Sequence, residues 1–83
     1  MNTPKVKPDR PIRVSIENGE VRVKLADGRL IGNPLEWHLW LANATPEQQA
    51  NYELYPLSVF WPDLDEGLDI QGMLIGIRPK QPA

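Results

Sequence analysis

The sequence contains no cysteine among its 83 residues. This absence excludes disulfide bonds, thiolate metal sites and cysteine nucleophiles, and it suits a reducing cytoplasm. Long apolar runs are also missing, since none approaches the roughly 20 residues that a helix needs to cross a bilayer. The basic N-terminus is followed by no apolar segment of the kind found in leader peptides. The sequence therefore predicts a soluble, cytoplasmic protein.

Positive charge and histidine are both scarce. The chain has 9 lysines and arginines against 11 acidic residues, a net charge of −2, so no overall basic field attracts phosphates. It has neither a glycine-rich phosphate loop nor a Gly-x-Ser-x-Gly nucleophile elbow. We expect the single histidine, His38, to lie on the surface of an amphipathic helix rather than in a catalytic triad. The expectation is a protein without enzymatic activity and without a cofactor.

Length and composition divide the chain into an arm, one domain and a tail. Prolines among polar and basic residues predict a flexible basic arm over residues 1–11, and residues 79–83 resemble a frayed tail. Residues 12–78 then form a single small domain. At this length a chain buries only about 60% of its unfolded surface, so such domains often depend on a partner or on self-association. We therefore consider a homo-oligomer as well as a complex with another protein.

The first half of the domain carries the pattern of a β-meander. Apolar and polar residues alternate at 12–16 and at 21–25, and the intervening Asn18-Gly19 pair is a strong hairpin signal. Asp27-Gly28 provides a second turn, after which residues 29–31 begin a third strand. Three antiparallel strands with one apolar face are therefore predicted.

Helical signals follow the meander. Leucine and tryptophan at spacings of three and four predict a short helix within residues 35–44. Thr45 then stands as an N-cap before Pro46, with Gln48 at the position that a capping box requires. A second helix is expected to run to about Tyr52.

The last part of the domain contains one further strand. Residues 56–61 are nearly all apolar, which predicts a strand buried on both sides, or nearly so, and ended by Pro62. Asp69 is a candidate cap for one more helical turn. The predicted fold class is α+β: a three-stranded antiparallel meander and a fourth strand, packed against one or two short helices.

Four carboxylates gather after the predicted fourth strand, at Asp63, Asp65, Glu66 and Asp69. Counted from Asp63, leucine stands at both the sixth and the twelfth position, where a calcium loop needs glycine and glutamate. We expect these residues to shape turns and face water, with Leu64 and Leu68 turned inward. Two alternatives are an acidic surface for a basic partner and a metal-assisted hydrolase that uses Asp63, Asp65 and Asp69 with His38.

Three tryptophans are many for so short a chain. Trp61 is expected in the core, because a small core needs its large buried area. Trp37 and Trp40 would share one face of a short helix, as core residues or as anchors of a protein interface. Together with the four carboxylates they form the candidate partner-binding surface.

Basic residues offer a different surface. The strand periodicity places Arg13, Arg22 and Lys24 on one solvent-facing side of the meander, next to the basic arm. These cations could contact phosphates, or they could form an ordinary solvated face. The candidate nucleic-acid surface comprises Lys5, Lys7, Arg10, Arg13, Arg22 and Lys24.

Motifs along most of residues 12–76 give the sequence a family resemblance. They are Asp27-Gly28-Arg29, Pro34-Leu35, Trp37, Leu41, Ala44-Thr45, Glu47, Asn51, Trp61-Pro62, Leu64-Asp65-Glu66 and Gly72-Met73-Leu74. This pattern resembles the small bacterial family called domain of unknown function 2442. His38-Leu39-Trp40 departs from it, because many members carry an aromatic residue followed by proline there.

The resemblance implies a compact α+β domain with a meander, a helical middle and a fourth strand, and it supplies no catalytic residues. Some relatives are fused to a helix-turn-helix module, which we expect this chain to lack. Others stand beside a second small gene, as in toxin–antitoxin pairs. Our leading hypothesis is a non-enzymatic, antitoxin-like interaction domain that binds a small basic protein encoded nearby. The alternative hypothesis is a nucleic-acid-binding or regulatory accessory domain.

Overall fold

The computed structural model describes residues 7–76, and within this range the chain forms two antiparallel three-stranded sheets and short helices. The outer part of the predicted arm, including Lys5, and the predicted tail at 79–83 lie outside the described residues. The α+β class predicted from the sequence is confirmed.

The first sheet is the predicted meander. It consists of β1 (Pro11–Glu17), β2 (Glu20–Leu25) and β3 (Leu30–Pro34), in the order β1-β2-β3. The Asn18-Gly19 turn between β1 and β2 has positive φ at both residues, 52° and 74°, as the sequence predicts for this pair. The register of β1 and β2 pairs Val14 with Val23, so the apolar residues of the two strands lie on the same face.

The second sheet contains more strands than the sequence predicts. It consists of β4 (Glu53–Tyr55), β5 (Ser58–Trp61) and β6 (Glu66–Asp69), in the order β4-β5-β6. β5 is the predicted fourth strand, and it ends before Pro62 as expected. One face of β5 is buried, with Val59 and Trp61, and the other is half-buried, with Ser58 and Phe60, so the strand comes near to the predicted burial on both sides.

The helices are short, and the first predicted one is interrupted. A 3-10 turn, η1 (Leu35–Trp37), is followed by α1 (Leu39–Ala42), and the residue between them, His38, has a non-helical backbone with φ −126° and ψ 76°. The capping box of Thr45 and Gln48 starts α2 (Pro46–Ala50) as predicted, although this helix ends before Tyr52. α3 (Ile70–Ile75) begins at the predicted Asp69 cap, whose carboxylate accepts from the Gly72 amide at 2.9 Å.

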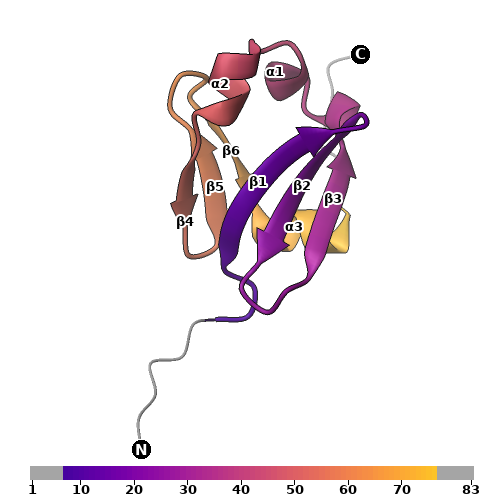
Figure 1. Ribbon diagram of the computed structural model, residues 1–83, viewed down its shortest axis with the longest axis vertical. Coiled ribbons are helices and arrows are strands. Elements are labelled where there is room, and N and C mark those ends of the chain that lie inside the picture. Colours follow the sequence, from indigo (N-terminus) through magenta and orange to yellow (C-terminus); the bar gives the residue numbers. More distant parts are fainter. Residues whose placement is uncertain (1–6, 77–83) are drawn as a thin grey trace, which may run out of the picture.

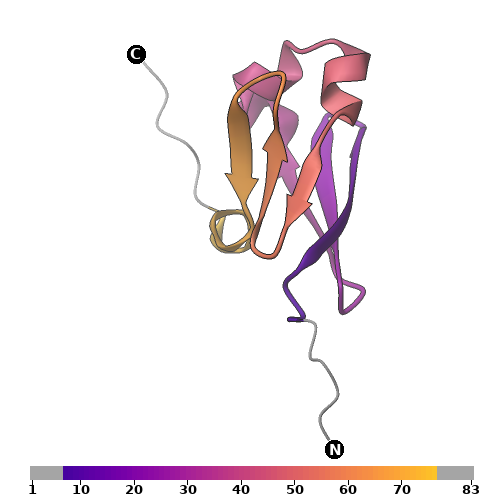
Figure 2. The ribbon, with the colours of Figure 1, turned by 90° about the vertical axis from the view of Figure 1, so that its left-hand side faces the viewer.

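The two sheets pack against each other and meet along β1 and β4 (Figures 1 and 2). α1 and α2 cover one end of the pair, whereas α3 lies at the other end beside β3 and β6. The core between the sheets consists of Val14, Val21, Val23, Leu25, Leu41, Val59, Trp61, Leu68, Ile70 and Met73. Among residues 7–76, no helix is long and apolar enough to cross a membrane.

Candidate functional site

The acidic segment shapes local structure at two of its four carboxylates. Asp63 accepts a hydrogen bond at 3.0 Å from the side-chain amide of Asn51, which ties the β5–β6 turn to the end of α2, and Asp69 caps α3. Asp65 is exposed in that turn with a φ of 51°, and Glu66 is exposed at the start of β6. Leu64 and Leu68 turn toward the core, as the sequence predicts.

These four carboxylates do not form a metal site. Within the described part of the chain, no group of three or more histidine and acidic side chains is arranged to hold a metal ion. The predicted hydrolase set of Asp63, Asp65, Asp69 and His38 is therefore not assembled in residues 7–76. Of these three aspartates, Asp69 alone lines the same groove as His38.

The three tryptophans occupy different environments. Trp61 is fully buried, as predicted, and its indole Nε1 donates to the Gln49 carbonyl at 2.9 Å. Trp40 is half-buried and packs edge-on against Trp61, with ring centroids 5.5 Å apart. Trp37 is also half-buried, but it ends η1 rather than continuing α1. The prediction that Trp37 and Trp40 share one helix is wrong, because the non-helical backbone of His38 separates them.

His38 is buried, so its predicted position on a helix surface is wrong. Only 6% of the residue is exposed, and its imidazole packs at 6.1 Å from the Trp40 ring. Its Nε2 atom is buried without a hydrogen-bond partner. Burial lowers the pKa of His38 below its ordinary value, because the charged form loses hydration. The imidazole is therefore neutral at pH 7.

An open groove of about 260 Å³ contains His38 and part of the acidic segment. β3 contributes Asn33 and α1 contributes Trp40, while β6 and α3 contribute the remaining lining residues apart from His38. The residues that line it are Asn33, His38, Trp40, Glu66, Gly67, Leu68, Asp69, Gly72 and Met73. Asn33 is only 4% exposed and donates to the Gly32 carbonyl at 3.1 Å. The groove thus joins two buried polar side chains, two carboxylates and an aromatic ring.

Sequence reasoning found part of this groove. Trp40, Glu66 and Asp69 belong to the predicted partner-binding surface and line the groove, whereas Trp37, Asp63 and Asp65 do not. The sequence did not predict Asn33 as a site residue, and it named His38 only in the alternative of a metal-assisted hydrolase. Asn33 follows a turn-like glycine and precedes a proline, which hides its place in β3. The one available signal for His38 was its position among leucines and tryptophans, which is unusual for an exposed side chain.

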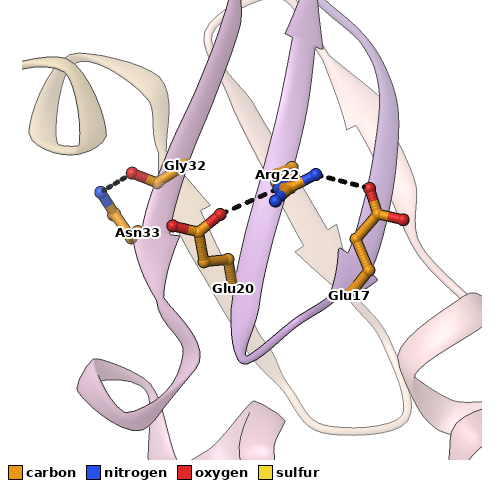
Figure 3. Close-up of polar contacts among 5 residues, drawn as sticks. All are labelled: Glu17, Glu20, Arg22, Gly32 and Asn33. Carbon is orange, nitrogen blue, oxygen red and sulfur yellow. Dashed lines mark hydrogen bonds and ion pairs between the residues drawn. The ribbon is translucent and has the colours of Figure 1, made fainter.

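The basic residues of the meander lie on its outer face, in the register that the sequence predicts. β1 and β2 pair Arg13 with Lys24 and Ser15 with Arg22. Arg22, however, lies between two glutamates, with its guanidinium 2.7 Å from Glu17 and 2.9 Å from Glu20 (Figure 3). The hydrogen bond to Glu20 is the main reason that the pKa of Arg22 is raised. Two carboxylates therefore offset much of the positive charge on this face.

The inner end of the basic arm is attached to the turn after β2. The Ala26 amide donates to the Arg10 carbonyl at 2.8 Å, and Arg29 forms ion pairs with Asp9 and Asp27. Lys7 and Arg10 are both exposed beside this turn. Backbone and side-chain hydrogen bonds from Arg29 lower the pKa of Asp27. Acidic neighbours thus accompany the cations at this end of the sheet as well.

A second groove, of about 470 Å³, follows the outer edge of β1. It runs between β1, α2 and Tyr52, with Val14 and Ile16 on the strand side and Ala50 on the helix side. The Tyr52 hydroxyl accepts a hydrogen bond from the Val14 amide at 3.2 Å, so this edge amide has a partner within the chain. Histidine and acidic side chains are absent from the described lining of this groove.

Comparison with known proteins assigns the chain to a family. The family model described as "Protein of unknown function (DUF2442)" matches residues 7–79. The chain belongs to this family. No curated protein matches the DUF2442 chain. The family identified from sequence motifs is thereby confirmed.

Two solved structures are similar to this DUF2442 chain. One is the crystal structure of a protein of unknown function from Rhodospirillum rubrum, with 22% identity and a TM-score of 0.71 over 87% of this chain and 92% of that one. The other is the solution NMR structure of an uncharacterised protein from Chromobacterium violaceum, with 27% identity and a TM-score of 0.71 over 86% of this chain and 69% of that one. Both likenesses support the fold.

Proposed function

We propose that this DUF2442 chain is a non-enzymatic protein-interaction domain that binds a small basic protein in the cytoplasm, as the antitoxin-like half of a two-gene operon. The observation that supports this function is the groove between β6–α3 and α1. Glu66 and Asp69 supply negative charge there, and Trp40 supplies an aromatic surface that is still half-exposed. Complementary charge steers a basic partner to such a surface, and tryptophan is enriched in protein interfaces.

The lining of the groove favours recognition over catalysis. Among its described residues there is no serine, threonine, cysteine, lysine or tyrosine that the neutral His38 imidazole could activate as a nucleophile. One of the two carboxylates, Asp69, already accepts the Gly72 amide as the cap of α3. The groove therefore provides contacts for a partner and offers little chemistry of its own.

Co-expression with the product of the adjacent gene tests this function. We expect the two proteins to co-purify and the complex to restore growth if the neighbour alone is toxic. The variant Glu66→Gln should weaken the complex, whereas Asp65→Asn removes the same charge from an exposed residue outside the groove and should leave it unchanged. Recovery of no neighbouring protein, together with no rescue of growth, would rule out the proposed function.

Nucleic-acid binding is a second candidate, favoured by the shared outer face of Arg13, Arg22 and Lys24. Glu17 and Glu20 pair with Arg22 on that same face, which reduces its attraction for phosphates. If the face binds nucleic acid, its affinity for duplex DNA should fall steeply between about 50 and about 200 mM salt. Proteins with many phosphate contacts lose affinity by about 10³-fold or more over this range. No binding at low salt would exclude this candidate.

A further inference from the structure

The groove contains a buried polar atom whose hydrogen-bonding capacity is unused. The Nε2 atom of His38 has no partner, although the residue is more than nine-tenths buried. Nearly all buried polar groups in folded proteins are hydrogen-bonded, so an unpartnered one needs an explanation. His38 lines the groove together with the carboxylates of Glu66 and Asp69, which accept hydrogen bonds. The Nδ2 group of Asn33 already donates to the Gly32 carbonyl. Nε2 is an acceptor when the neutral imidazole carries its proton on Nδ1, and in that tautomer a ligand that donates a hydrogen bond would satisfy it.

The groove combines acceptors with apolar and aromatic surface. The carboxylates of Glu66 and Asp69 carry negative charge, and the amide of Asn33 is buried beside them. Leu68 and Met73 present apolar atoms along which an alkyl chain can lie. The π face of the Trp40 ring attracts cations. Negative charge, neutral acceptors and an aromatic ring together describe a site for an organic cation.

We propose that this groove binds an arginine side chain of the basic partner, with the guanidinium hydrogen-bonded to His38 and Glu66 and placed against Trp40. This inference rests on the proposed function and names the group that the partner contributes. A guanidinium presents five N–H donors in one plane and also stacks on aromatic rings, so it can meet several separated acceptors at once. The burial that keeps His38 neutral leaves one ring nitrogen able to accept.

Two other cations suit the groove less well. A metal ion needs several converging ligands, and within residues 7–76 no three histidine or acidic side chains provide them. A lysine ammonium is a compact, strongly hydrated point charge, which matches acceptors spread over two walls less well than a planar guanidinium does. The volume of about 260 Å³ and the open mouth allow entry of a side chain from a partner surface.

NMR titration of the full chain with Nα-acetyl-arginine amide tests the inference directly. We expect saturable shifts confined to the amides of Gly67 and Gly72 and to the indole N–H of Trp40. The citrulline compound has the same length but no charge and should cause no saturable shift there, and the lysine compound should bind more weakly. Each compound is titrated at constant ionic strength and pH 7.

Matched variants separate the groove from general charge. Glu66→Gln should lower the affinity for the arginine compound about fivefold, as expected for loss of a partly exposed ion pair. Asp65→Asn makes the same change of net charge outside the groove and should not alter the affinity. His38→Gln should also weaken binding. Because Glu66 is exposed, its variant is expected to fold even if the His38 variant does not.

The outcomes distinguish this inference from the proposed function. Equal shifts with citrulline, equal affinity of the two acidic variants, shifts outside the groove, or no shift at 100 mM ligand would each overturn the arginine site. If these occur while the neighbouring gene product still co-purifies, the interaction function stands and the arginine site fails. Saturable arginine binding without any co-purifying partner would retain the site and reject the proposed function.

Discussion

At the scale of single residues, the structure depends on a few buried side chains that carry polar atoms. Trp61 fills the centre of the core, contacts Trp40 and Tyr52, and donates to the Gln49 carbonyl. His38 is the opposite case, because its Nε2 is buried without a partner. Trp61 links the second sheet to α2, whereas His38 leaves a nitrogen in the groove without a hydrogen bond. Each supports a separate prediction.

Replacing Trp61 with phenylalanine should lower the free energy of unfolding by about 2 to 4 kcal/mol. The smaller ring leaves a cavity in the core, and the Gln49 carbonyl loses its donor. Urea denaturation followed by circular dichroism measures the change. Tyr55→Phe is the control, because that hydroxyl is exposed and donates only to Glu53, and it should change stability by less than about 0.5 kcal/mol. Equal effects of the two variants would contradict this account of Trp61.

His38 should make stability depend on pH near neutrality. Its pKa is lowered in the folded state by burial, so the unfolded chain binds the proton more readily. The free energy of unfolding therefore suffers no loss from His38 above about pH 6.5, the ordinary pKa of histidine. It declines as the pH falls from there through the lowered pKa of the folded state. Glu66 and Asp69 line the same groove, and the pKa of His38 is nevertheless lowered by burial. The lowered pKa of Asp27 acts at more acidic pH.

Urea midpoints measured between pH 8 and pH 5 test the role of His38. The His38→Gln variant, which has no imidazole to titrate, should show a flat profile over the upper part of this range. A decline of the same size in the variant and the parent would assign the pH dependence to other groups.

At the scale of elements, local signals determined what could be predicted. The Asn18-Gly19 turn, the Thr45 capping box and the Asp69 cap act within four residues, and each was identified from the sequence. β4 and β6 were missed because no alternating apolar pattern marks them. All residues of β4 are exposed, and only Leu68 of β6 is buried. Both pair with β5 through short turns, at Pro56-Leu57 and at residues 62–65, which contain no Asn-Gly or Asp-Gly signal. The burial of His38 and Asn33 in one groove is tertiary.

Gly67 shows how closely β6 approaches β5. A Cβ atom at this position would lie 2.7 Å from the Val59 carbonyl oxygen, which is a backbone atom that cannot move alone. We expect Gly67→Ala to separate the strands locally and to lower the free energy of unfolding by about 1 to 3 kcal/mol. Gly32→Ala in β3 is the matched control, because its Cβ would meet only side-chain atoms at 3.6 Å or more. Denaturant midpoints that fall equally for both would contradict this reason.

At the scale of the whole molecule, two small sheets share one core. Val21 and Val23 of the first sheet and Val59 and Trp61 of the second are all fully buried in the same cluster. Leu41 of α1 and Ile70 and Met73 of α3 complete this core, so each sheet packs on residues of the other sheet and of the helices. Neither sheet is therefore expected to remain folded after the other unfolds, although each sheet is formed by one continuous segment of the chain.

We predict a single cooperative unfolding transition. Tryptophan fluorescence reports mainly on the second sheet and α1, whereas hydrogen exchange of the Val21 and Val23 amides reports on the first sheet. Their free energies of opening should agree within about 0.5 kcal/mol if the whole chain unfolds in one step. Two clearly different values would show that the sheets unfold independently.

The hydrogen bond between the Val14 amide and the Tyr52 hydroxyl also bears on the behaviour of the protein at high concentration. An outermost strand with free amides can recruit an extended segment of another molecule and start irregular assembly. Here an aromatic side chain from a distant loop occupies one of these amides and stands where an incoming strand would need to lie. Tyr52 thus hinders edge-to-edge pairing of β1 with a strand of another molecule.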